Sequence, residues 1–177
     1  MIGRSSSFLF AMFFCADGVA LAAKAPLNTS LCAADEQVYF SCRVANGSKR
    51  IALCGQVKEP TDGEGSFLQY RFGERGNPEM VFPSAWEASL DKFSYSGAYS
   101  KMGRTGSEEV SFHRGNFDYT VYMMFYPLGD AESSGYAHMA GVRVARDGQD
   151  VANVKCGGTP QAALGELSWL RYVCRDV

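Results

Sequence analysis

The residues that could do chemistry in this chain are few and widely spaced. Its two histidines, His113 and His138, are the side chains whose ordinary pKa lies near neutrality. Neither is spaced for a serine triad, and no G-x-S-x-G, H-x-H or H-E-x-x-H motif is present. We therefore predict no enzymatic activity, no metal and no cofactor. The alternative in this class is a small extracytoplasmic hydrolase that uses scattered carboxylates with His113 or His138.

Two short segments instead have the composition of binding surfaces. Residues 93–100 (FSYSGAYS) join small hydroxyls, a glycine and two tyrosines ahead of a Gly/Ser-rich basic loop. Such a segment can protrude into a cleft, and Ser96, Gly97 and Tyr99 are its candidate ligand-binding residues. An ordinary transition from strand to loop is the plainer interpretation.

The second segment carries an arginine between aromatic residues on an alternating strand. Tyr70 and Phe72 share one face and Arg71 takes the other. The plainer interpretation is a packed aromatic pair with a solvated arginine. The functional interpretation is a binding patch formed by Tyr70 and Arg71, because Tyr and Arg are enriched in binding hot spots.

The N-terminus has the order of features that is typical of an export signal. Arg4 supplies the charge, residues 8–16 form an apolar run of nine, and Ala20-Leu21-Ala22 fits a peptidase site. The run is too short to span a bilayer, which needs about 20 residues. We predict a signal peptide over residues 1–23, one β-rich domain over 24–177, a periplasmic or secreted location and no membrane span.

Five cysteines remain after such cleavage, and an oxidising compartment favours disulfides between them. The number is odd, so at least one thiol is free or pairs between chains. In the first hairpin the alternation places Cys42 on the inner face and Cys54 on the outer face, so these two cannot meet. We predict the bridges Cys32–Cys54 and Cys156–Cys174, with Cys42 as a buried free thiol.

The alternation of apolar residues predicts an all-β chain of about eight strands, either an antiparallel sandwich or a small barrel. The Asn46-Gly47 turn pairs Cys42 with Ile51 and Phe40 with Leu53 in the first hairpin, over 37–54. The other expected strands cover 66–72, 79–82, 92–96, 109–113, 117–126, 137–146 and 150–156.

Three further patterns concern the second half of the chain. The strand over 117–126 is apolar on both faces from Val121 onward, so it is either central or part of an interface. In the strand over 137–146, His138 alternates in phase with the apolar residues Ala140, Val142 and Val144, so we expect it to point inward. Thr159-Pro160 starts a short C-terminal helix, with Leu164, Leu167 and Leu170 spaced for one face. That helix brings Cys174 back toward Cys156.

Charge and length narrow the set of partners. The 177 residues include 17 basic and 19 acidic side chains, so the chain lacks the basic excess that binding to a phosphate backbone needs. We predict no nucleic-acid partner. The expected partner is a protein or an envelope ligand, and the expected oligomeric state is a monomer or a homodimer.

The chain resembles a group of exported bacterial proteins of unassigned function over most of its mature length. The pattern is C…EQVYFSC…K…ALCG…YRFG…EMVFP over residues 32–83, followed by FHRGNFDYTVY over 112–122. This resemblance implies export and a β-rich fold, and it implies no activity.

A second, local resemblance concerns Ser94-x-Ser96-Gly97-x-Tyr99, which is similar to the S-x-S-G-x-x-Y loop of bacterial C-type lysozyme inhibitors. Those proteins are small exported β-barrels that insert this loop into the lysozyme cleft. The first hairpin (YFSC…NGSK) is also similar to their opening strand. The tyrosine here stands one residue early and the chain is longer. The resemblance implies that Ser96 and Tyr99 contact a lysozyme-like enzyme.

Together these patterns favour a non-enzymatic binding protein of the periplasm or the medium, with inhibition of a cell-wall hydrolase as its most specific form. The hydrolase is one alternative. The other is an envelope structural protein that assembles through the face formed by Tyr122, Met124 and Tyr126.

Overall fold

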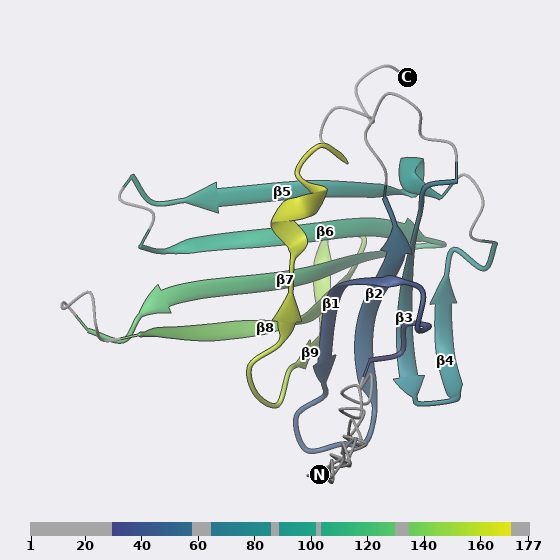
Figure 1. Ribbon diagram of the computed structural model, residues 1–177, viewed down its shortest axis with the longest axis horizontal. Helices are drawn as coiled ribbons and strands as arrows, with labels where there is room; N and C mark the ends of the chain where they lie inside the picture. Colours follow the sequence, from purple (N-terminus) through teal and green to yellow (C-terminus); the bar gives the residue numbers. More distant parts are fainter. Residues whose placement is uncertain (1–29, 58–64, 86–88, 102–103, 130–134, 171–177) are drawn as a thin grey trace, which may run out of the picture.

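The computed structural model of the protein describes residues 30–57, 65–85, 89–101, 104–129 and 135–170 (Figure 1). The predicted signal peptide over residues 1–23 and the predicted bridge partner Cys174 lie outside these residues.

The described residues form two antiparallel five-stranded sheets, which confirms the all-β prediction. Their strand orders, β10-β1-β2-β3-β4 and β5-β6-β7-β8-β9, are open, so the fold is the sandwich of the two predicted architectures. The first sheet contains β1 (Gln37–Arg43), β2 (Arg50–Gln56), β3 (Phe67–Glu74), β4 (Asn77–Phe82) and β10 (Gln161–Ala162). The second contains β5 (Phe93–Tyr99), β6 (Gly106–Arg114), β7 (Phe117–Pro127), β8 (Tyr136–Arg146) and β9 (Gln149–Lys155).

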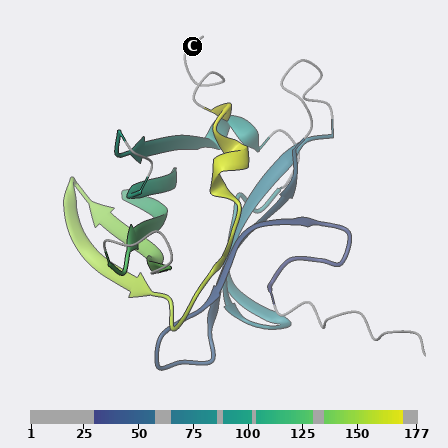
Figure 2. The same cartoon turned by 60° about the vertical axis from the view of Figure 1, so that its left-hand side comes forward.

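The strands of the two sheets run crosswise, so the sheets overlap over only part of their length (Figures 1 and 2). The C-terminal ends of β5 and β7, with the neighbouring starts of β6 and β8, reach out beyond β1 and the rest of the first sheet. The 3-10 helix η3 (Leu164–Leu167) packs against β1 and β6 where this overlap ends. Side chains on the far ends of β5–β8 therefore lack a facing sheet.

The core between the sheets follows from the alternation of apolar residues. Phe40 pairs with Leu53 and Cys42 with Ile51, in the register that the Asn46-Gly47 turn predicts. The second sheet supplies Phe112, whose ring lies 4.6 Å from that of Phe82 and 4.9 Å from that of Tyr119. The largest fully buried side chains are Phe40, Phe93, Ile51, Leu53, Leu68, Leu164, Leu167, Leu170, Val110, Val121 and Val142.

The sheets meet at a corner that a disulfide closes. An isolated bridge pairs Val44, after β1, with Cys156, after β9, and the Cys156 N–H donates to the carbonyl of Ala140 in β8 at 2.9 Å. Cys42 and Cys156 form a disulfide across this corner, with Cα atoms 5.7 Å apart. The predicted Cys156–Cys174 bridge and the predicted free thiol at Cys42 are therefore wrong. Both cysteines face inward from different sheets, and the crosswise packing brings them together.

The predicted Cys32–Cys54 bridge is confirmed, with Cα atoms 5.3 Å apart. It ties the segment before β1 to the outer face of β2. The short helix predicted from Thr159-Pro160 begins later than expected. β10 pairs with β1 instead, the Ala163 N–H donates to the Tyr39 carbonyl, and the short 3-10 helix η3 follows. The leucines at 164, 167 and 170 are fully buried as their spacing predicted.

The two bridges can be checked by peptide mapping of the unreduced protein. We expect a linked pair of peptides that contains Cys42 and Cys156, whereas a Cys156–Cys174 pair would contradict the structure. The Cys42→Ala/Cys156→Ala variant should lose about 2–5 kcal/mol of unfolding free energy in urea, because the bridge closes a loop of 114 residues in the unfolded chain.

Candidate functional site

The five candidate binding residues fall into two groups on different sheets. Ser96, Gly97 and Tyr99 lie on β5, an edge strand of the second sheet, whereas Tyr70 and Arg71 lie on β3 of the first. The structure therefore does not bring them into one site.

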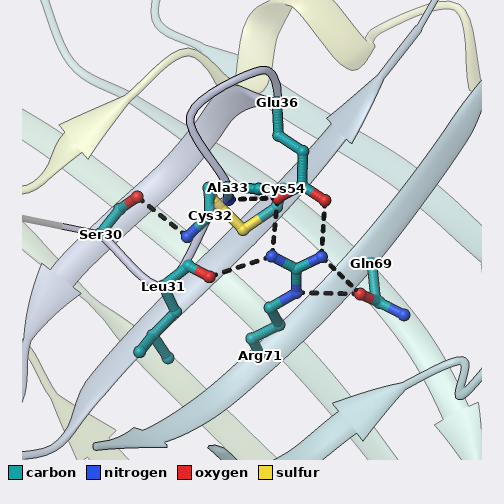
Figure 3. Close-up of a disulfide and its surroundings, with 8 residues drawn as sticks. All are labelled: Ser30, Leu31, Cys32, Ala33, Glu36, Cys54, Gln69 and Arg71. Atoms are coloured by element: carbon teal, nitrogen blue, oxygen red, sulfur yellow. Dashed lines mark hydrogen bonds and ion pairs between the residues drawn. A yellow bond between two sulfur atoms is a disulfide. The ribbon is translucent and has the colours of Figure 1, made fainter. Parts of the chain in front are cut away.

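Arg71 is held on the outer face of the first sheet by two residues of the segment before β1 and by one residue of its own strand (Figure 3). Its Nη1 and Nη2 each donate to one carboxylate oxygen of Glu36 at 2.6 Å. Its Nε and Nη2 donate to Gln69 Oε1 at 2.9 and 2.7 Å, and Nη1 also donates to the Leu31 carbonyl at 3.0 Å. A guanidinium has five N–H donors, and these contacts engage all five. The prediction of a solvated arginine is wrong.

The Arg71 network fixes the segment that precedes β1. The Glu36 carboxylate also accepts the Ala33 N–H at 2.6 Å, and the Cys32–Cys54 disulfide lies beside it (Figure 3). Cys32, Glu36 and Cys54 form the one group of metal-ligand types found among the described residues. The two sulfurs are bonded to each other in the disulfide, and the Glu36 carboxylate accepts hydrogen bonds from Arg71. None of the three groups is therefore available as a metal ligand, and the cluster has a structural role.

Tyr70 lies in the core, with 2% of its surface exposed and its ring 5.0 Å from that of Phe112. Burial, with a smaller contribution from neighbouring Tyr119, raises the pKa of its phenol well above the usual range. Its packing agrees with the plainer interpretation of this strand.

Tyr99 is the exposed member of a hydrogen-bonded group at the end of β5. About half of its surface is exposed, and its hydroxyl donates to Glu108 and lies 3.3 Å from the Tyr95 hydroxyl. Partial burial, then the bonds to Glu108 and Tyr95, raise the pKa of Tyr99 above the usual range. The neutral phenol is thereby kept as a donor to the Glu108 carboxylate.

Two glycines leave room for this group. A Cβ on Gly97 would stand 2.6 Å from the Tyr95 hydroxyl, and one on Gly165 of η3 would stand 2.8 Å from a Glu108 carboxylate oxygen. The role of Gly97 is therefore to leave space for the Tyr95 side chain. Gly97 and Tyr99 were predicted from the sequence, whereas Glu108 and Gly165 were not. The contact between Glu108 and Gly165 depends on how η3 packs on β6, which the sequence pattern does not indicate.

Beyond η3 the second sheet forms what we call the overhang, the end of β5–β8 that has no facing sheet. On its inner face the rings of Tyr99 and Phe125 lie 6.2 Å apart, and those of Phe125 and Tyr136 lie 6.1 Å apart. His138 shares this face through its pairing with Phe125, but it is exposed. His138 therefore lies on the inner face that its position in the alternation predicts, but it is not buried, because the first sheet ends before it.

The outer face of the overhang is apolar as well. Met124 and Met139 are cross-strand partners, and they are 41% and 45% exposed. Tyr126 follows on β7 with 41% exposure. A shallow groove of about 380 Å³ runs along this end, between Tyr99 and Tyr126. The overhang therefore presents large apolar side chains to solvent on both faces.

The other histidine belongs to a polar groove on the outer face of the second sheet. His113 Nδ1 lies 2.9 Å from Asp118 Oδ1, and the Ser111 and Thr120 hydroxyls are bonded to each other at 3.1 Å. The His113 and Asp118 side chains are 65% and 57% exposed. A base oriented by an acid is present, but the neighbouring hydroxyls engage one another.

Comparisons of the chain with protein-family models, with curated proteins and with solved structures found no match. No helix among the described residues has the length and apolar character needed to cross a membrane. The two disulfides fit an oxidising, extracytoplasmic compartment.

The Arg71–Glu36 pair can be tested by Glu36→Gln. The two side chains are only 17% and 11% exposed, so loss of the carboxylate leaves a buried cation uncompensated. We expect a loss of about 3 kcal/mol of unfolding free energy in urea. The matched control is Glu79→Gln, which breaks the exposed Lys49–Glu79 pair and should cost under about 1 kcal/mol. Equal losses would contradict the structural role of Arg71.

The raised pKa values of Tyr70 and Tyr99 predict a loss of stability in alkali. Above about pH 10 the phenols of the unfolded chain lose their protons while these two phenols of the folded chain keep theirs. The unfolded state then binds fewer protons, so the free energy of unfolding falls as pH rises. Denaturant titrations across this range should show a shallower fall in Tyr99→Phe, and an unchanged slope would contradict the role of its hydroxyl.

Proposed function

We propose that the protein is a periplasmic or secreted, non-enzymatic binding protein, and that the overhang is where a protein partner docks. The observation that carries this proposal is the exposure of aromatic and methionine side chains on both faces of one sheet end. Seven large hydrophobic side chains are exposed among the described residues. Five of them lie on the overhang, Leu128 lies beside it, and Val151 lies on β9. Such a patch marks an interaction site, and Tyr and Met are enriched at interfaces.

The shape of the overhang favours a partner with a cleft. β5 is an edge strand, so it can enter a cleft with one face toward each wall. Ser96 and Tyr99 are both exposed, and their strand positions place them on opposite faces. This arrangement differs from a protruding loop, yet it offers both residues to one cleft. Inhibition of a cell-wall hydrolase of the lysozyme type is the narrower form of the proposal.

The hydrolase alternative rests on the His113–Asp118 pair. A binding role is better supported, because both side chains are more exposed than buried and the neighbouring Ser111 and Thr120 hydroxyls bond each other. The structural alternative rests on Tyr122, Met124 and Tyr126. Tyr122 is 4% exposed, with its hydroxyl bonded to Asn153 at 2.9 Å, so of these three residues only Met124 and Tyr126 are exposed to a partner.

The proposal predicts that substitutions on the overhang weaken binding of the partner. Purified residues 24–177 should bind and inhibit members of a lysozyme panel, and Tyr99→Ser/Tyr136→Ser should weaken binding by about tenfold or more, since each ring is a hot-spot candidate. Ser96→Ala/Tyr99→Ala tests the narrower pair. Val151→Ser is the matched control, because Val151 is 55% exposed on β9.

Three outcomes decide between the possibilities. Inhibition that is lost in both overhang variants but kept in Val151→Ser supports the narrower form. Absence of inhibition, with an envelope protein captured through the overhang and not by the variants, overturns the lysozyme form and keeps the binding role. Hydrolytic activity of the protein itself that disappears in His113→Ala contradicts the proposal and favours the hydrolase.

A further inference from the structure

A small polar pocket lies at the corner of the sandwich, away from the overhang. Its volume is about 190 Å³, and its walls come from β1, β2, the start of β10 and the loop after Cys156. The polar side chains of this corner pocket are Ser41, Arg43, Arg50, Thr159 and Gln161.

Two arginines face each other across this corner. Arg43 and Arg50 are directly paired residues of β1 and β2, so their side chains leave the sheet on the same face. Like charges in this position destabilise a sheet. Arg71, Arg143 and Arg146 each reach a carboxylate, whereas neither Arg43 nor Arg50 has an ion pair with any described residue.

The pocket also contains unmet hydrogen-bonding capacity. Ser41 Oγ and Arg50 Nε are the two buried side-chain atoms of the described residues that lack a hydrogen-bond partner. Ser41 is 5% exposed, and both residues line the pocket. A buried donor without an acceptor costs free energy, so native proteins rarely retain one without a reason. An acceptor group placed in the pocket would satisfy both donors.

The walls of the pocket are held in place before any ligand arrives. The Cys42–Cys156 disulfide anchors the loop after β9, and the Gly157 N–H donates to the Arg43 carbonyl at 2.8 Å. Gly158 has a φ of +137°, a conformation that favours glycine and carries the chain past the pocket toward β10. A rigid site loses little entropy when it binds.

We propose that the corner pocket binds a small oxyanion through Arg43, Arg50 and Ser41. Guanidinium groups recognise carboxylate and phosphate through parallel N–H donors, and the Ser41 hydroxyl adds a further donor. The volume is below the range of about 300–1,000 Å³ that is usual for whole organic ligands, so the site takes an inorganic ion or one anionic head group. This binding site is independent of the overhang and of its proposed protein partner.

The test is a titration of residues 24–177 with sodium phosphate, and separately with sodium acetate, at constant ionic strength against sodium chloride. We expect saturable shifts of the Arg50 side-chain N–H and Ser41 backbone N–H resonances, with a rise in Tm. Arg50→Gln should weaken binding by about tenfold or more, because it removes a charged donor. Arg114→Gln, an exposed arginine at the end of β6, is the matched control and should bind as the wild type does.

Ser41→Ala gives a second measurement that does not depend on a damaged fold. Without an anion it should be at least as stable as the wild type, because its hydroxyl has no partner to lose. In phosphate the wild type should gain stability and Ser41→Ala should gain less. Saturable binding of phosphate, of acetate or of both supports the proposal and identifies the preferred geometry. Binding of neither, or equal losses in Arg50→Gln and Arg114→Gln, overturns it.

Discussion

The disulfide between Cys42 and Cys156 joins the two sheets at the corner where they meet, and much of the remaining structure is arranged around that corner. The bond joins the first and last hairpins, whose strands also exchange backbone hydrogen bonds there. Because the sheets are held crosswise at this point, they cover each other only partly. The covered part forms the aromatic core around Phe112, and the uncovered part is the overhang. The polar pocket is built on the outer side of the same corner.

Local periodicity predicted the elements and much of the first hairpin, since a two-residue Asn-Gly turn leaves one register in which Phe40 and Leu53 share a face. It also turned Cys42 and Cys156 inward, yet it carried no information on which inward cysteines would be neighbours. That depends on the crossing of two sheets. The partner of Arg71 was missed for a related reason. Glu36 lies 35 residues earlier, in an irregular segment before β1, where no periodic pattern indicates which way its side chain points.

Local periodicity also does not show where one sheet stops covering the other, and this limited the prediction of the candidate site. Alternation placed His138 on the correct face of β8, but parity does not tell where the opposite sheet ends, and His138 proves to be exposed. The apolar character of both faces of 117–126 admitted a central strand or an interface. The structure confirms the central strand, since β7 is the middle strand of its sheet, and it leaves Met124 and Tyr126 near the end of β7 exposed on the overhang. The sequence predicted Ser96 at the end of a strand and Tyr99 at the start of a loop, and the structure places both in the edge strand β5.

The connectivity of the cysteines has a consequence for how the protein is made. A chain that enters an oxidising compartment with its N-terminus first presents Cys32, Cys42 and Cys54 together, while the true partner of Cys42 follows 114 residues later. An oxidase that joins cysteines in order of arrival would link Cys32 to Cys42 and leave Cys54 alone. An exported chain would reach the observed connectivity either by folding the first hairpin before it is oxidised or by exchanging an early Cys32–Cys42 bond for the native pairs.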